Sequence, residues 1–285
     1  MNRKIIASSL ITLFYLTFVH SNYAQSVAVD GTKIEYRVYG DGDTTLVFIH
    51  GWAIDQSYWQ SQVDHFHENY QVVTLDLAGH GQSESDREDW TIPAFGKDVL
   101  SVIDTLHLTN VVIIGHSMGG DVMLEAATQI PERIIALVGV DNFKDVGTLP
   151  SEEERKQTES VFEMMETNFA EVVDGYARSM LFTPESDSLL VASVAQDMKS
   201  ANQAMAISSI KHLFGYVERE IDLLEQSSAK LYLIQSDALP TDTVALTQHA
   251  AKGFEIFSVG EVSHYPMVEI PEVFNNTLEE ILSGL

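Results

Sequence analysis

Most apolar residues of this chain lie in short runs rich in β-branched side chains. Runs that are almost continuously apolar are typical of parallel strands covered on both faces, and they occupy residues 45–50, 71–77, 110–116, 134–140, 230–235 and 254–259. Residues 33–39 alternate apolar and polar side chains, as a half-exposed strand does. Helix-like stretches lie between the runs, for example at 94–107, 117–130 and 271–283. This alternation predicts an α/β fold with a doubly wound, mostly parallel sheet.

One region breaks the alternation. Residues 145–228 contain no convincing strand, and near their start the acidic S-E-E-E-R-K-Q favours a helix. The pattern predicts a helical cap at 145–228 inserted into an α/β core of 26–144 and 229–285. A cap over a pocket and an extra packing layer both fit it. The bulky apolar residues of the segment fit either a pocket roof or the interior of the cap: Met164, Met165, Met180, Phe182 and Met205.

The first 25 residues have the layout of a secretory signal peptide. Arg3 and Lys4 precede an apolar run at 5–19, and Ala24 supplies a small residue for cleavage. The run is short compared with the roughly 20 residues of a membrane span. We therefore expect a signal peptide at 1–25, cleavage, export to the periplasm or the medium, and no stable membrane anchor.

Composition narrows the classes of partner. The chain has 42 Asp and Glu residues against 16 Lys and Arg, a formal charge of −26, which repels nucleic acid and anionic lipid head groups. It contains no cysteine, which excludes disulfides, thiolate catalysis and cysteine-ligated zinc. No motif indicates a metal or a cofactor, and none indicates an oligomeric state.

The stretch V-V-I-I-G-H-S-M-G-G-D (111–121) joins a buried strand directly to a helix. A G-x-S-x-G pattern alone is weak, but Gly115, Ser117 and Gly119 lie at the strand-to-helix turn that a nucleophile elbow requires. Small neighbours tolerate the strained backbone of such a turn, and the helix that begins there directs free N–H groups at a developing oxyanion. A plain tight turn needs no serine at its tip, so Ser117 is the predicted nucleophile.

A serine nucleophile needs a general base and an acid that orients the base. His264 follows the last predicted strand in a loop before the final helix, whereas most of the other histidines are simpler to explain as surface or packing residues. His264 is therefore the predicted base. Two aspartates after Ser117 are candidates for the acid: Asp237, just beyond the strand at 230–235, and Asp141, at the end of the strand at 134–140. We predict Asp237, with Asp141 as the alternative acid or as a residue of the cap hinge or pocket.

The oxyanion needs hydrogen-bond donors. His50-Gly51-Trp52 ends another strand, and Gly51 allows close approach of the backbone to a ligand. The backbone N–H groups of Trp52 and Met118 are predicted to form a two-donor hole, each donor being worth about 3–4 kcal/mol. A helix-entry turn with an aromatic plug is the alternative explanation of H-G-W.

From residue 31 to 285 the sequence resembles the α/β-hydrolase superfamily. The matching pieces, in family order, are H-G-W (50–52), L-D-L-A-G-H-G-Q-S (75–83), G-H-S-M-G-G (115–120), the Asp237 loop and S-H-Y-P-M-V-E-I-P-E-V-F-N (263–275). The resemblance implies structural roles for Asp76 and Gly79, and a variable helical cap that sets substrate choice. It also supports Asp237 as the acid, although a minority of members place the acid one strand earlier, at the position of Asp141.

The resemblance implies a serine hydrolase of the esterase or lipase kind, with a small-molecule carboxylic ester or a lactone as substrate and an acyl-enzyme on Ser117. The aspartate nucleophile of the related dehalogenases and epoxide hydrolases is absent, because the elbow carries serine. Amidase or perhydrolase activity on the same triad, and a ligand-binding receptor without turnover, are the alternatives that the motifs leave open.

Overall fold

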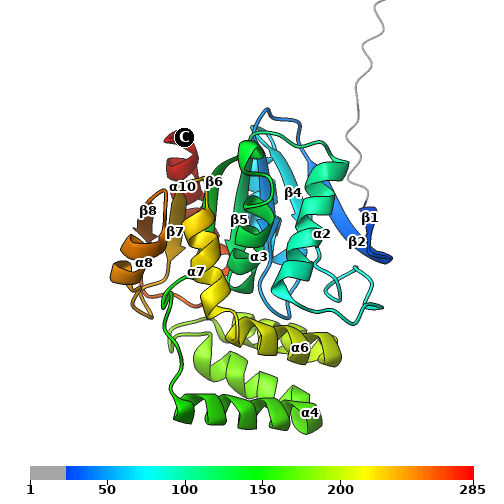
Figure 1. Ribbon diagram of the computed structural model, residues 1–285, viewed down its shortest axis with the longest axis vertical. Helices are drawn as coiled ribbons and strands as arrows, with labels where there is room; N and C mark the ends of the chain where they lie inside the picture. Colours follow the sequence, from blue (N-terminus) through cyan, green and yellow to red (C-terminus); the bar gives the residue numbers. More distant parts are fainter. Residues whose placement is uncertain (1–23) are drawn as a thin grey trace, which may run out of the picture.

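The computed structural model describes residues 24–285, which fold around one sheet of eight strands (Figure 1). The spatial order is β1-β2-β4-β3-β5-β6-β7-β8. The strands are β1 (Gln25–Val29), β2 (Thr32–Tyr39), β3 (Thr45–Ile49), β4 (Gln71–Leu75), β5 (Val111–His116), β6 (Ile134–Val140), β7 (Leu231–Gln235) and β8 (Phe254–Ser258). The pairs β1–β2 and β2–β4 are antiparallel and every other pair is parallel. The predicted doubly wound, mostly parallel sheet is confirmed.

Sequence periodicity did not predict β1. It forms a hairpin with β2, in which Val29 pairs with Thr32 across a two-residue turn. The turn residues Asp30 and Gly31 both have positive φ, 49° and 95°. An Asp-Gly pair is a strong signal for such a hairpin turn, and here it lies just after the predicted signal peptide.

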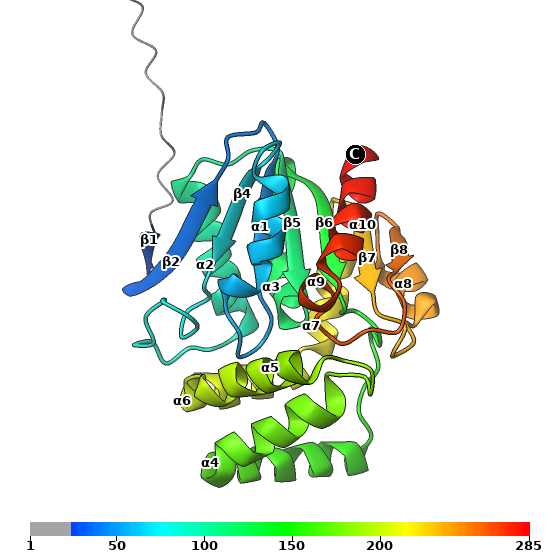
Figure 2. The same ribbon diagram turned by 180° about the vertical axis from the view of Figure 1, so that it is seen from behind.

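Helices cover both faces of the sheet. Figure 1 shows α2 and α3 in front of it, whereas α1, α9 and α10 lie on the opposite face in Figure 2. The helices of the core are α1 (Gln60–Phe66), α2 (Ile92–Thr105), α3 (Met118–Ala127), α8 (Thr243–His249), α9 (Pro266–Glu269) and α10 (Pro271–Ser283), with 3₁₀ turns at Gln56–Trp59 and Pro131–Arg133. The central strands β3 and β5 are buried along their whole length, as their continuous apolar runs predict.

Four helices lie between β6 and β7, in the region where the sequence predicts the cap: α4 (Glu152–Met180), α5 (Ser188–Ser200), α6 (Gln203–Phe214) and α7 (Val217–Gln226). In Figure 1, α4 and α6 lie below the sheet and α7 returns the chain to it. The α4 helix begins at a capping box formed by Ser151 and Glu154, and its helical geometry is broken at Asn168 (φ −133°, ψ 42°). The indole N–H of Trp52 donates to Ala206 O of α6 at 2.9 Å, which joins cap and core.

The predicted signal peptide falls almost wholly outside the described residues, and β1 begins at Gln25, where cleavage is expected. Within residues 24–285, none of the helices combines the length and the apolar character that a membrane crossing demands.

Candidate active site

Ser117 occupies a strained turn between β5 and α3. Its φ is 51° and its ψ is −124°, a region that L-residues rarely adopt and that costs on the order of 1–3 kcal/mol. The two flanking glycines are required by close packing, because a Cβ on Gly115 would lie 2.3 Å from Gly119 O and one on Gly119 would lie 2.7 Å from Ile49 O. The Ser117 N–H donates to Val140 O at 3.0 Å, which fixes the turn against β6. The elbow therefore holds a serine side chain at the wall of a cavity.

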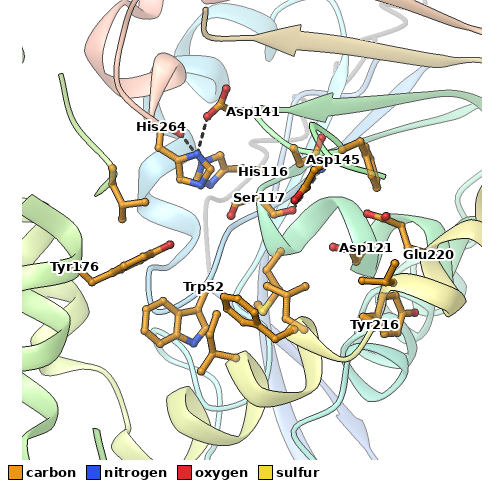
Figure 3. Close-up of a pocket in the computed structure, with 18 of the residues that line it drawn as sticks. Trp52, His116, Ser117, Asp121, Asp141, Asp145, Tyr176, Tyr216, Glu220 and His264 are labelled. Atoms are coloured by element: carbon orange, nitrogen blue, oxygen red, sulfur yellow. Dashed lines mark hydrogen bonds and ion pairs between the residues drawn. The ribbon is translucent and has the colours of Figure 1, made fainter. Parts of the chain in front are cut away.

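His264 lies in the loop between β8 and α9 and lines the same cavity as Ser117 (Figure 3). Its backbone N–H donates to Leu181 O at 2.8 Å, and its backbone oxygen accepts from His116 Nε2 at 2.7 Å. Its ring Nδ1 donates to Asp141 Oδ2 at 2.6 Å. Since Nδ1 carries the proton, Nε2 is left as the basic nitrogen.

The acid that contacts His264 is Asp141, the residue directly after β6. Asp141 has a positive φ of 46° and is 7% exposed. Its Oδ1 accepts from Ser236 N at 3.0 Å and pairs with Lys144 Nζ at 2.9 Å. Burial by itself raises the pKa of Asp141, but the hydrogen bond from His264 and the charges of His264 and Lys144 outweigh burial and lower it to about 2. Asp141 is therefore a charged acceptor over the whole neutral range.

The prediction that Asp237 is the acid is wrong. Asp237 is exposed, and its carboxylate accepts from Ser258 Oγ at 2.6 Å, at the edge of the sheet. The Asp141 carboxylate, on a backbone with a positive φ of 46° directly after β6, already occupies His264 Nδ1. The backbone N–H of Asp237 bonds to Gly260 O, which holds its turn against the loop after β8.

The two predicted oxyanion donors line the cavity beside Ser117. Within residues 24–285, the backbone N–H groups of Trp52 and Met118 donate to no other protein group. A Cβ on Gly51 would lie 2.6 Å from His116 Nδ1 and 3.3 Å from Ser117 Cβ. Because glycine has no Cβ, this turn can lie close to the elbow. An oxyanion hole requires two such free N–H groups beside the nucleophile.

Histidines near the elbow are occupied by structural hydrogen bonds. Burial, followed by the neighbouring charge of His264, lowers the pKa of His116 to about 3, and its Nε2 bonds to the His264 backbone. His50 Nε2 accepts from Leu77 N at 3.0 Å. Of His50, His116 and His264, His264 is thus the one whose Nε2 has no hydrogen-bond partner within the described residues.

Asp76 and Gly79 have the structural roles that the resemblance implies. The Asp76 carboxylate accepts from Gln56 N at 2.9 Å and from Gln82 N at 2.8 Å, so it joins two loops. Gly79 has a φ of 77°, and a Cβ there would lie 2.8 Å from Met205 of the cap. The absence of a side chain at Gly79 therefore allows this core loop to lie close to Met205 of α6.

The cavity beside Ser117 has a volume of about 560 Å³ and is lined by both core and cap. The cap contributes Tyr176, Leu181, Met198, Ile210, Leu213, Phe214, Tyr216 and Val217 among its apolar and aromatic lining. None of the five bulky residues considered for a pocket roof lines it. Met165 and Met205 are buried, Met164 and Met180 are 48% and 66% exposed, and Phe182 stacks on Tyr265 at 5.6 Å between ring centroids. The pocket-roof interpretation of these five residues is therefore wrong.

Sequence reasoning missed an acidic end of the cavity. Four carboxylates that it did not single out line the cavity: Asp121, Asp145, Glu154 and Glu220. Figure 3 shows Asp121, Asp145 and Glu220 on the side away from His264. The signal available was Asp121 in G-G-D, which places an acid in the first turn of the helix after the elbow. Among residues 24–285 there is no group of three or more His, Cys, Asp or Glu arranged to hold a metal ion.

Comparisons with known proteins agree with this geometry. The sequence profile of the alpha/beta hydrolase fold matches residues 44–177. The chain is 34% identical to strigolactone esterase RMS3 of Pisum sativum over 149 residues, which span 50% of this chain and 56% of that protein. It thus covers little more than half the length of that relative.

Two further relatives match over most of their length. The chain is 25% identical to 3-oxoadipate enol-lactonase 2 of Acinetobacter baylyi, over 92% of this chain and 97% of that protein. It is 24% identical to karrikin insensitive 2 receptor IA of Petunia hybrida, over 84% of this chain and 90% of that protein.

Among solved structures, bromoperoxidase from Bacillus anthracis superposes with a TM-score of 0.80 and 18% identity, over 92% of this chain and all of that one. This likeness extends through the sheet and the cap and concerns the fold. The strand order, the elbow at Ser117 and these matches together show that the described chain has the α/β-hydrolase fold.

Proposed function

We propose that this protein is a serine hydrolase that cleaves a carboxylic ester of small or medium acyl size, or a lactone, through an acyl-enzyme on Ser117. The proposal rests on two residues that line one cavity. Ser117 lies on a strained elbow, and His264 Nδ1 bonds to the buried carboxylate of Asp141 at 2.6 Å. This combination matches the roles of a catalytic triad.

In the proposed mechanism, His264 Nε2 removes the proton from Ser117 Oγ as the oxygen attacks the ester carbonyl carbon. The carbonyl oxygen becomes an oxyanion and accepts hydrogen bonds from the N–H groups of Trp52 and Met118. Collapse of this intermediate breaks the bond to the leaving oxygen, which takes the proton from His264. Water, deprotonated by His264, then attacks the acyl-enzyme and regenerates Ser117. Asp141 stabilises the imidazolium at both stages and stays charged, because its pKa is about 2.

The size of the cavity supports a small or medium substrate. Its volume of about 560 Å³ falls within the roughly 300–1,000 Å³ of typical small-molecule sites. Bulky lining groups such as Leu181, Ile210 and Phe214 limit the length of acyl chain that fits. Short-to-medium acyl esters should be preferred, and rapid hydrolysis of emulsified triolein with a jump at the oil–water interface would contradict this size class.

A receptor without turnover is the second candidate, because a relative that matches over most of its length is named as a receptor. A series of p-nitrophenyl esters of increasing acyl length separates the two functions. Multiple turnover that disappears in Ser117→Ala supports the hydrolase. Saturable binding of these esters with at most one turnover per protein would support the receptor.

We also propose that the protein is exported, on the evidence of the signal-like residues 1–25. Cleavage near Gln25 or Ser26 leaves β1 nearly intact, because this strand begins at Gln25. N-terminal sequencing of the protein purified from its native cell tests the proposal. A mature chain that begins with Met1 would contradict it.

A further inference from the structure

The acidic end of the cavity has no counter-charge. Asp121, Asp145 and Glu220 line it, and within residues 24–285 none of the three forms an ion pair with a lysine or arginine. No lysine or arginine is among the described residues that line the cavity. The fourth carboxylate, Glu154, is bonded to Ser151 in the capping box of α4. Figure 3 shows Asp121 and Glu220 close together on the side of the cavity away from His264.

Asp121 is the most buried of these groups. It is 8% exposed, and its Oδ1 has no hydrogen-bond partner within the described residues although it lies at the cavity wall. Burial, followed by the charge of the nearby Glu220, raises the pKa of Asp121 well above its ordinary value. A buried carboxylate is costly unless a partner compensates its charge.

The other buried carboxylates of the described chain have such partners. Asp98 pairs with Arg87, Glu125 with Arg219, Glu35 with Lys33 and Asp141 with Lys144, and Asp76 accepts from two backbone N–H groups. Asp121 therefore departs from the rule that the rest of this protein follows. Asp121 lines the cavity in which the substrate would lie.

Glu220 of α7 adds a second carboxyl group at this point, and a bound cation would stabilise the charged forms of both carboxyls. Burial and the charge of Asp145 raise the pKa of Glu220 to about 7, and its carboxyl group lies close enough to Asp121 to share a hydrogen bond with it. The aromatic rings of Phe143, Phe214 and Tyr216 line the same cavity. Carboxylates beside aromatic faces form the kind of surface that binds an organic cation, through charge and through cation–π attraction.

We infer that this acidic end is a subsite for a positively charged ammonium group carried by the substrate, an inference that rests on the proposed ester hydrolysis. Asp121 follows Ser117 by four residues at the start of α3, so its Cα lies about 6 Å along the helix from that of the nucleophile, at a rise of roughly 1.5 Å per residue. The favoured substrate is therefore an ester whose ammonium group is separated from the reacting carbonyl by a short chain of about this length.

Two pairs of esters, matched in shape and differing in charge, test the inference. Butyrylcholine and 3,3-dimethylbutyl butyrate place the ammonium group or its neutral carbon isostere on the alcohol side. Phenyl 4-(trimethylammonio)butanoate and phenyl 5,5-dimethylhexanoate place it on the acyl side. We expect kcat/KM for the ammonium ester to exceed that of its neutral isostere at least about tenfold in one pair, the effect of a desolvated cation site.

The variants Asp121→Asn and Glu220→Gln should each lower this ratio toward one. Glu218→Gln is the matched control, because Glu218 is an exposed residue of the same helix that does not line the cavity, and its replacement removes the same charge. The control should keep the wild-type ratio. Circular dichroism and thermal unfolding of each variant show that the comparison is made on folded protein, and Glu220→Gln serves alone if Asp121→Asn does not fold.

The outcomes distinguish the inference from the function on which it rests. If the wild-type protein hydrolyses neutral isosteres at least as well as ammonium esters, the subsite is refuted and the ester hydrolase stands. Retention of the preference by both Asp121→Asn and Glu220→Gln, or its loss in Glu218→Gln, also refutes the subsite. Failure of all four esters and of the p-nitrophenyl series would refute the proposed function itself.

Discussion

Replacement of Asp141 by asparagine should nearly abolish ester hydrolysis, whereas the same change at Asp237 should not. Asp141 is buried, and its carboxylate accepts the Nδ1 proton of His264 at 2.6 Å. An asparagine of the same shape has no negative charge to stabilise the imidazolium, and its amide group does not fix the tautomer that leaves Nε2 free. The Asp237 side chain is exposed, and its carboxylate accepts from Ser258 Oγ at the sheet edge.

The magnitude follows from the role of the carboxylate. Loss of the orienting acid in a Ser-His-Asp site lowers kcat about 10⁴-fold, which corresponds to about 5.4 kcal/mol of transition-state stabilisation at 1.36 kcal/mol per tenfold change. A pKa of about 2 shows that Asp141 is charged whenever His264 works as a base. For Asp237→Asn the surroundings of His264 are unchanged, so kcat should stay within about twofold of the wild-type value.

The assay is the steady-state hydrolysis of p-nitrophenyl butyrate at pH 8 by both variants, with folding checked by thermal unfolding. A folded Asp141→Asn protein that keeps more than about a tenth of the wild-type kcat would refute the assignment. An inactive Asp237→Asn together with an active Asp141→Asn would show that Asp237 is the acid, as the sequence predicts.

The remaining predictions concern stability. The pKa of Glu220 is raised to about 7 beside Asp121 and Asp145. The folded protein therefore binds the proton of the Glu220 carboxyl group more tightly than the unfolded chain does. This contribution to stability is lost as pH rises from about 4.5 to about 7. Glu220→Gln should therefore gain Tm relative to wild type across this window, by on the order of a few degrees, and parallel Tm–pH curves would contradict this. Gly119→Ala should lower the free energy of unfolding by roughly 1–3 kcal/mol or more, since its Cβ would lie 2.7 Å from Ile49 O; urea denaturation with an unchanged midpoint would show that the elbow is not so tightly packed.

The parts of the fold that the sequence predicts well are those with strong local patterns. Strands β3, β5 and β6 read as continuous apolar runs because both of their faces are covered. Ser117 was identified because a strained turn between a buried strand and a helix restricts its neighbours to small residues. β1 was not predicted, because its hairpin turn lies beside a segment already interpreted as a signal peptide.

The acid could not be predicted because the choice depends on which of two strand-end turns directs its carboxylate at His264. Asp141 and Asp237 both follow a strand, both lie between Ser117 and His264 in the chain, and both have turn residues around them. The contact of Asp141 with His264 Nδ1 distinguishes them, together with the positive φ of 46° that turns the Asp141 backbone. A residue directly after its strand, as Asp141 is, stays nearer the sheet edge than one that follows by two positions.

The cavity lining was equally beyond sequence reasoning. Met165 and Met180 both belong to α4, yet one is buried in the cap and the other is 66% exposed. Which face of α4 meets the cavity is set by its packing against the other cap helices. Asp121 likewise has no lysine or arginine partner among the described residues. This depends on which residues lie near it in the folded protein, and no local sequence pattern predicts it.

The role of Ser117 as nucleophile is tested by kcat/KM of Ser117→Ala with a short p-nitrophenyl ester, on protein shown to be folded by thermal unfolding. The alanine removes only the hydroxyl and leaves Asp141, His264 and the two backbone donors in place. The account predicts a loss of about 10⁴-fold or more, because no other group at the elbow supplies a nucleophile. A folded variant that retains more than about a tenth of the wild-type activity would contradict it.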